Sequence, residues 1–317
     1  MSLALTLALY AAAVACIGGT AWRVWVWAAT PEPFQIPTTT AQQRALTGIE
    51  ASRVESPSTT TGVIGRMCLE VFLFRSLFRN TAVRKTPADR GVLSGLVFLE
   101  RKALWLGAMA FHWSLLVIVV RHLRLFIDPI PRIVAGLAAL DGFFEVGSPT
   151  WYATDVIVVS AIGYLLLRRL RDPLLRYLTL PADYMALAAL LAITGTGIVL
   201  RYGVRVDLVT VRRFTLGLAA FAPAPLPESG VWLAAHALSV SFLLAILPFT
   251  KMMHAAGIWL SPTRNQPNDS RRRRHVNPWN APVPVHGYEA WQDEFRDKLR
   301  SAGIPIDEAQ RDGPRTE

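Results

Sequence analysis

Residues 103–127 read ALWLGAMAFHWSLLVIVVRHLRLFI. A helix of about 20 apolar residues crosses the hydrocarbon core of a membrane, so this run is long enough to span it. It nevertheless contains His112, Arg121 and His122, which are unfavourable in contact with lipid. The run therefore predicts a membrane-spanning helix whose polar side chains find partners inside a bundle.

The composition of the whole chain also indicates a membrane protein. Of its 317 residues, 52% are hydrophobic and only 18% are charged, which is too apolar for an ordinary soluble domain. Four further segments are candidates to span the membrane, namely residues 3–28, 151–167, 182–200 and 231–260. The first of them could also be a cleaved signal peptide, although no basic region precedes it. We therefore predict an all-α integral membrane bundle of five transmembrane helices.

Positive charges are distributed unevenly among the connections, and Lys and Arg near helix ends favour the cytoplasmic side. Residues 128–150 carry one arginine and three acids, whereas four arginines follow residues 182–200 and oppose the general pattern. The connections predicted to be cytoplasmic carry Arg66, Arg75, Arg79, Arg84, Lys85, Arg90, Arg101, Lys102, Arg168, Arg169, Arg171, Arg176 and the run 271–274. This predicts a periplasmic N-terminus and a cytoplasmic C-terminus in a bacterial inner membrane. The positive-inside rule explains the net charge of +10, because the arginines border the apolar segments. Nucleic-acid binding is not indicated, since no aromatic residues that could stack on bases are interleaved with the arginines.

Histidines are the only clustered side chains suited to a redox metal. Cys16 and Cys68 stand far apart, outside any motif for an iron–sulfur cluster, a c-type haem or a structural zinc ion. Four of the six histidines, His112, His122, His236 and His254, lie in the predicted spans 103–127 and 231–260. A single membrane histidine is more often a packing residue or a proton relay, and zinc or copper usually takes more ligands than a pair.

Because the two spans run in opposite directions, their histidines form one pair in each membrane leaflet. His112 and His254 lie toward the cytoplasm, whereas His122 and His236 lie toward the outside. Facing imidazoles are the axial ligands that a six-coordinate b-type haem requires, so the layout predicts two haem b. The cations expected beside the haem propionates are Arg121, Arg124 and Arg201 at the outer pair and Arg101, Lys102 and Lys251 at the inner pair.

The helical spacing of the two histidine sets does not match. The ten residues between His112 and His122 rise about 15 Å, whereas the eighteen between His236 and His254 rise about 27 Å. Pro248 lies within the longer interval and is expected to kink that helix. A kink or a tilt of the helix reduces the mismatch.

The motifs H-x9-H and H-x17-H, in a chain with five predicted spans, resemble the respiratory nitrate reductase gamma-subunit family of dihaem cytochromes b that oxidise quinol. The resemblance implies that His112 and His254 bind the inner haem and that His122 and His236 bind the outer one. It also implies a quinone pocket beside the outer haem, where His122, Arg121 and Arg124 are candidates to bind a quinone oxygen.

Two further features resemble the haem b subunit of the Dsr complex, the DsrM-type protein associated with dissimilatory sulfite reductase. One is the long basic connection before residue 103, and the other is the tail RHVNPWNAPVPVHGYEAWQDEFRDKLRSAGIPID at residues 274–307. This likeness implies a cytoplasmic iron–sulfur partner similar to heterodisulfide reductase and a role in sulfur metabolism. The tail contains a possible amphipathic helix that a soluble subunit could bind or that water could simply solvate.

These inferences divide the chain into four regions. Residues 1–28 form the first transmembrane helix, 29–102 a cytoplasmic basic connection, 103–260 a four-helix haem-binding core and 261–317 a cytoplasmic docking tail. Within the connection, residues 62–80 suit either the inner membrane surface or a partner subunit. The predicted function is electron transfer between quinone and the iron–sulfur subunit, in either direction. A redox-silent anchor for soluble subunits and a proton-relay transporter are the alternatives.

Overall fold

A computed structural model describes residues 2–30, 53–85, 96–100, 102–144, 149–225, 230–268 and 287–306. The chain divides into two compact units. The first comprises Met1–Thr30 and Phe34–His275, and the second comprises Pro31–Pro33 and Val276–Glu317. The run of arginines at 271–274 and the proline-containing segment up to residue 286 lie outside the described residues, so the predictions made for them stay predictions.

Four long helices of the first unit have the length and composition to cross a membrane. They are α1 (Ser2–Ala29), α4 (Lys102–His122), α8 (Pro181–Ile198) and α10 (Gly230–Ile246). The corresponding apolar stretches are Leu3–Ala29, Lys102–Leu125, Pro181–Val204 and Gly230–Phe249. The chain is therefore a multi-pass membrane protein.

The fifth predicted span is also a helix, α6 (Ala153–Arg171). Within the described ranges it is not among the helices apolar enough to count as a span, because Asp155 lies in its first turn and Arg168, Arg169 and Arg171 lie in its last. A fifth crossing, and with it the orientation of the termini, stays a prediction.

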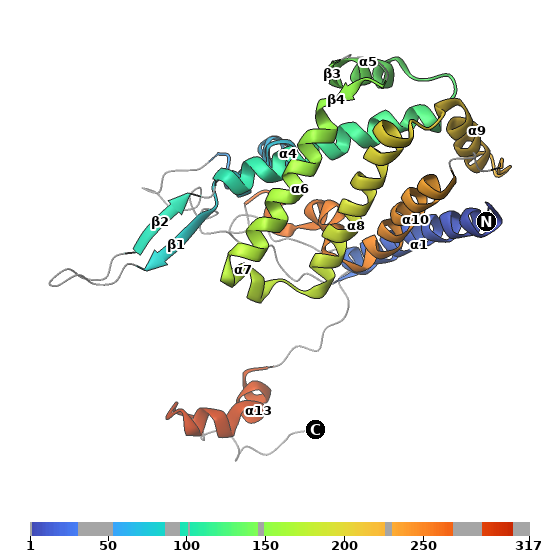
Figure 1. The fold of residues 1–317 in the computed structure, drawn as a ribbon. Coiled ribbons are helices and arrows are strands. Elements are labelled where there is room, and N and C mark those ends of the chain that lie inside the picture. Colours follow the sequence, from blue (N-terminus) through green and yellow to red (C-terminus); the bar gives the residue numbers. More distant parts are fainter. Residues whose placement is uncertain are drawn as a thin grey trace, which may run out of the picture. The chain divides into compact units, whose positions relative to one another are not determined.

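The long helices pack in the order α4, α6, α8, α10 and α1 (Figure 1). The main core lies where α4, α6 and α8 meet, and Ile162 and Val158 are its most deeply buried side chains. Small residues permit close approach between helices in a membrane, and a Cβ on Gly107 of α4 would lie 2.6 Å from the ring of Tyr164. A second core joins α1 and α10 through Leu5 and Ala234.

The last membrane helix is shorter than the predicted run of residues 231–260. Helix α10 ends at Ile246, and 3-10 turns follow at Leu247–Phe249 and Lys251–Met253 before the short helix α11 (His254–Gly257) begins. Pro248 causes this break, because it lacks an amide hydrogen and its ring clashes with the preceding helical turn. The predicted kink is thus a complete helix end.

This break interrupts the continuous helical rise from which the mismatch in histidine spacing was calculated. The helical part of the interval runs only from His236 to Ile246 and rises about 15 Å, the same as from His112 to His122. Helix α1 contacts the break directly, since Arg23 Nε donates to the carbonyl of Pro248 at 3.0 Å. The glycine at position 19 leaves room for the proline, because a Cβ there would lie 2.7 Å from it.

Shorter elements lie at the two ends of this bundle. At the end that carries His122 and His236 are α5 (Arg132–Asp141), the strands β3 (Gly142–Phe144) and β4 (Trp151–Tyr152), the π-helical turn Val199–Val204 and α9 (Leu208–Ala219). At the other end are α2 (Thr60–Leu73), α3 (Arg75–Phe78), α7 (Pro173–Leu178) and α12 (Pro262–Asn265). The described chain is mostly helical, as predicted, and its exceptions are β3–β4 and a second short antiparallel pair, β1 (Thr81–Lys85) with β2 (Leu96–Glu100).

The described part of the second unit contains α13 (Tyr288–Ser301). Its aromatic side chains follow one another at helical spacing, with ring centroids 6.0 Å apart for Tyr288 and Trp291 and 5.8 Å apart for Trp291 and Phe295. Tyr288 and Trp291 are exposed. The predicted amphipathic helix of the tail is present.

Candidate functional site

The structure brings the four membrane histidines together in the two predicted pairs. The ring centroids of His122 and His236 are 6.5 Å apart, and their planes differ by 18°. Those of His112 and His254 are 5.9 Å apart, and their planes differ by 87°. Each pair joins α4 to the last membrane helix or to the turns that follow it. His122 is the last residue of α4, whereas His112 lies near its middle.

Hydrogen bonds to backbone carbonyls determine, for three of the four histidines, which ring nitrogen keeps a lone pair that can bind a metal. A backbone carbonyl can only accept a hydrogen bond, so a ring nitrogen beside it carries the hydrogen and the other nitrogen keeps a lone pair. Three of the four rings have Nδ1 beside such a carbonyl: His112 at 2.8 Å from Ala108 O, His122 at 2.7 Å from Ile118 O and His254 at 2.8 Å from Lys251 O. Their Nε2 atoms are therefore available as metal ligands. His236 is held differently, with Nδ1 3.0 Å from Thr196 Oγ1.

The separation within each pair fits two imidazoles on one ion. A metal–imidazole bond is about 2 Å long, and the ring adds about 1 Å on each side, so the centroids of two opposed ligands lie about 6 Å apart. The observed 5.9 Å and 6.5 Å agree with this value. In the part of the chain that the structure describes, no third His, Cys, Asp or Glu joins either pair. Two axial nitrogens are what a haem requires, since its macrocycle supplies the other four.

Aromatic side chains surround the pair formed by His112 and His254. The ring of Phe74 meets His112 edge-on at 5.0 Å, and Phe111 does so at 4.9 Å. Phe74 occupies the left-handed backbone region, with φ 49°, at the junction of α2 and α3. Two tryptophans of α4 fix this junction, because Trp105 donates to the carbonyl of residue 73 and Trp113 to that of residue 72. Part of the segment 62–80 thus lies against α4 beside the inner pair.

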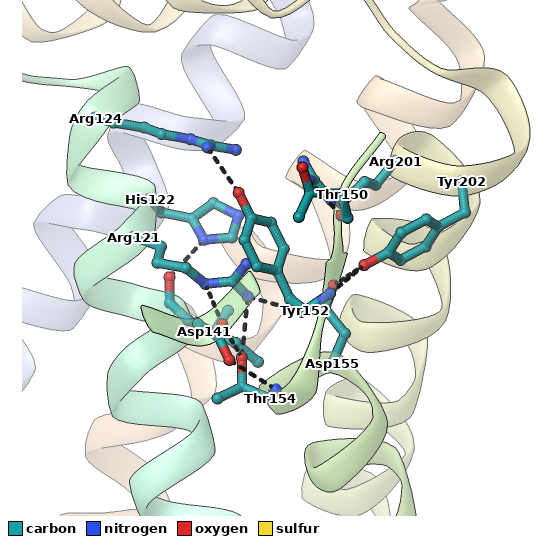
Figure 2. Close-up of polar contacts among 11 residues, drawn as sticks. Arg121, His122, Arg124, Asp141, Thr150, Tyr152, Thr154, Asp155, Arg201 and Tyr202 are labelled. Carbon is teal, nitrogen blue, oxygen red and sulfur yellow. Dashed lines mark hydrogen bonds and ion pairs between the residues drawn. The ribbon is translucent and has the colours of Figure 1, made fainter. Parts of the chain in front are cut away.

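Arg121 lies in a buried cluster of opposite charges beside the outer pair (Figure 2). Its Nε is 3.0 Å from Asp141 Oδ2, and its Nη2 is 2.7 Å from Asp155 Oδ1. Thr154 accepts from Arg121 Nη2 at 3.1 Å and donates its hydroxyl to Asp141 at 2.6 Å. The side chains of Arg121 and Asp141 are only 6% and 5% exposed. The role of Arg121 beside a propionate or a quinone stays a prediction; in the structure its ion pairs with two aspartates join α4 to α5 and α6.

Arg124 and Arg201 are the other two cations predicted beside the outer pair (Figure 2). Both contact Tyr152: the Arg124 Nη1 lies 3.4 Å from its hydroxyl, and the Arg201 guanidinium lies 4.1 Å from the centre of its ring. Arg201 also donates to the carbonyl of Thr150 at 2.8 Å, while its buried Nε has no hydrogen-bond partner among the residues that the structure describes. Over the described residues, neither arginine forms an ion pair with a carboxylate. Both are therefore suited to hold an anionic group beside the outer histidines.

Two of the three cations predicted at the inner pair form polar contacts within the protein. Lys251 Nζ is 2.7 Å from Asp183 Oδ2, and Lys102 Nζ donates to the carbonyl of Phe78 at 2.8 Å. Arg101 lies outside the described residues. Lys251 is largely exposed, so its ion pair with Asp183 is a weak surface contact that a stronger anion can displace.

The sequence predictions missed Asp155, Tyr152 and Thr196. Asp155 was detectable, because an ionisable residue within a membrane-length run marks a functional or buried site. It accepts from Tyr202 at 2.8 Å as well as pairing with Arg121. Tyr152 and Thr196 carry no such signal, since each takes its place only when helices distant in the sequence pack together.

Comparison with known proteins places the chain among membrane redox subunits. Residues 62–266, which include both histidine pairs, match the protein family described as nitrate reductase gamma subunit. Over 284 residues the chain is 40% identical to the Hdr-like menaquinol oxidoreductase cytochrome b-like subunit of Archaeoglobus fulgidus. The aligned region covers 87% of this chain and 83% of that protein. The subunit of the same description from Archaeoglobus profundus is 40% identical over 277 residues, covering 84% of this chain and 80% of that protein. No solved structure matches the chain.

Proposed function

This chain belongs to the nitrate reductase gamma-subunit family as a cytochrome b membrane subunit, and from that premise we propose that it carries electrons through two b-type haems. His122 and His236 hold one haem, and His112 and His254 hold the other. The observation that carries this proposal is the two pairs of facing imidazoles, one at the middle of α4 and one at its C-terminal end, at separations that fit a shared ion.

Each haem, when bound, supplies a one-electron redox centre. The residues of the chain supply ligation and charge. The backbone carbonyls at Nδ1 keep His112, His122 and His254 in the tautomer that presents Nε2 to iron. Arg201 would hold a propionate of the outer haem, Arg124 is available to a propionate or to the quinone, and Lys251 is the candidate at the inner haem.

A quinone is the proposed redox partner within the membrane. Two relatives are described as menaquinol oxidoreductase subunits, which favours a quinol as electron donor for this chain too. We place its head group near His122, where Arg124 Nη1 and the hydroxyl of Tyr152 can donate to a quinone oxygen (Figure 2). Arg121 acts there indirectly, because Asp141 and Asp155 occupy its guanidinium.

The electron acceptor is proposed to be an iron–sulfur subunit similar to heterodisulfide reductase, in a complex of sulfur metabolism. The Hdr-like description of the relatives supports such a partner, and the likeness of the tail to the DsrM-type subunit supports the pathway. The orientation that serves this route has the N-terminus outside and the inner pair on the cytoplasmic side. The two relatives are archaeal, so the bacterial inner membrane stays a prediction and the proposed location is the cytoplasmic membrane.

The absorption spectrum of the purified protein tests the proposed function. We expect b-type bands that sharpen on reduction, two haems per chain, and reduction of both haems by a menaquinol analogue. Protein that folds and assembles but lacks these bands would support the redox-silent anchor or the proton-relay transporter. Bands that dithionite reduces but quinol does not would retain the cytochrome and exclude quinol as the electron donor.

Truncation of the tail tests the proposed partner contact. Helix α13 exposes Tyr288 and Trp291 and lies in a unit separate from the membrane bundle. A chain ending after Arg274 should therefore keep both haems but lose most of its co-purification with the iron–sulfur subunit. A matched variant with Tyr288→Ser and Trp291→Ser should show the same loss while it keeps the full length. Unchanged co-purification in both variants would place the contact in the basic connection instead.

A further inference from the structure

We propose that Thr196 is a positioning residue for His236 and that its hydroxyl sets the reduction potential of the outer haem. This rests on the proposed function, because it takes His236 as an axial ligand. Of the four paired histidines, three have Nδ1 within 2.7–2.8 Å of a backbone carbonyl three or four residues earlier in their own segment. His236 instead has Nδ1 3.0 Å from the side-chain hydroxyl of Thr196, on another helix.

The direction of this hydrogen bond follows from the single hydrogen of the hydroxyl. Thr196 Oγ1 lies 2.6 Å from the carbonyl of Ala192 and 3.1 Å from that of Ile193, and both oxygens can only accept. The hydroxyl hydrogen is therefore used within α8, and its oxygen accepts from Nδ1–H of His236. The lone pair of His236 then lies on Nε2, the nitrogen that faces a shared ion in this proposal.

The next residue of α8 provides space for the same ring. A Cβ on Gly197 would lie 3.3 Å from His236 Cε1 and 3.7 Å from its Nδ1. The first distance is tighter than an ordinary van der Waals contact, so even an alanine would displace the imidazole. Two consecutive residues of α8 thus set the ring of His236, one through a hydrogen bond and the other through the absence of a side chain.

The hydrogen bond has a predictable electronic effect. An acceptor at Nδ1–H makes an imidazole more basic and a better donor to its metal, which favours the oxidised ion. Loss of this acceptor by mutation is therefore expected to favour the reduced ion and to raise the reduction potential of the outer haem. Thr196→Val keeps the shape of the side chain and removes the acceptor.

The test is a redox titration of the purified protein, followed by absorption, with the outer haem identified as the one that His122→Ala removes. Thr196→Val should raise the reduced-to-oxidised ratio of that haem at a fixed potential by up to about tenfold, equivalent to about 59 mV for a one-electron couple. The inner haem should not change. The ferric electron paramagnetic resonance signal of the outer haem should also shift, because the imidazole plane loses its fixed orientation.

Thr194 offers a matched control two residues away. Its hydroxyl donates to the carbonyls of Leu190 and Leu191 in the same way, at 2.9 Å and 3.2 Å, but within the described residues it forms no hydrogen bond with a histidine. Thr194→Val should leave both potentials unchanged, and Thr196→Ser should restore the wild-type value.

Two results would overturn the inference while the proposed function stands. One is an unchanged outer potential in Thr196→Val, which would show that the nearby carbonyl of Ile193 holds His236. The other is an equal shift in Thr194→Val, which would show a general effect of altering α8. Wild-type protein without b-type bands would instead refute the proposed function and this inference together.

Discussion

Alanine at either His122 or His236 should remove the same haem, so that the haem content falls from two to one per chain. Both rings face one site at a centroid separation of 6.5 Å, and a six-coordinate haem that loses one axial imidazole loses half of its protein ligands. Alanine at His112 or His254 should remove the other haem for the same reason. Haem extracted per mole of protein gives the count, and reduced-minus-oxidised spectra show which bands disappear.

Combining substitutions separates this pairing from the alternatives. The double variant of His122 and His236 should keep one haem, as each single variant does, whereas the double variant of His122 and His254 should keep none. His275 and His286, in the tail, serve as controls, and their replacement should leave both haems bound. If alanine at His112 and alanine at His122 removed one common haem, the pairs would lie along α4 and the assignment would be wrong.

The membrane fold was predictable because it follows from local composition. Apolar runs of about 20 residues are visible without any knowledge of packing, and four of the five predicted spans have the length and composition expected. The break before His254 was only partly predictable. Pro248 predicts a disturbance, but whether a proline kinks a helix or ends it depends on the neighbours that pack against it, here Arg23 of α1, which donates to the carbonyl of Pro248.

In the candidate site, too, some features were predictable from the sequence and others depended on packing. The histidine pairs follow from the order and direction of two helices, so their spacing in the sequence was enough to predict which ring faces which. The roles of the arginines depend on contacts that no spacing encodes. Arg121, Arg124 and Arg201 look equivalent in the sequence, yet over the described ranges only Arg121 has aspartates within ion-pairing distance.

Removing the Arg121 side chain should destabilise the protein more than any other change at this end of the bundle. Arg121→Ala leaves Asp141 and Asp155 without their cation, and breaking a buried ion pair from one side costs about 3–5 kcal/mol. The side chains of Asp141 and Asp155 are 5% and 16% exposed, so water compensates little of this loss. Thermal unfolding in detergent, followed by circular dichroism, should show a much lower midpoint.

Arg124 provides the matched control, because it is a nearby arginine whose contact with Tyr152 is long, at 3.4 Å, and involves no carboxylate. Arg124→Ala should cost less than about 1 kcal/mol, the usual range for a weak polar contact. An equal loss in both variants would show that the ion pairs of Arg121 add nothing specific to stability.

A charge-neutral combination then identifies the cause of the Arg121 effect. If the uncompensated carboxylates are responsible, adding Asp141→Asn and Asp155→Asn to Arg121→Ala should restore much of the lost stability, although each asparagine substitution alone is destabilising. A triple variant that is more stable than the sum of the separate losses predicts would show that the three charged side chains are energetically coupled. Stability that falls further in the triple variant would show instead that the arginine acts by packing, through its guanidinium over the ring of Tyr152 at 3.7 Å. Recovery would explain why a membrane-length helix retains an arginine at this position: its charge is neutralised where α4, α5 and α6 meet, one residue before the proposed haem ligand His122.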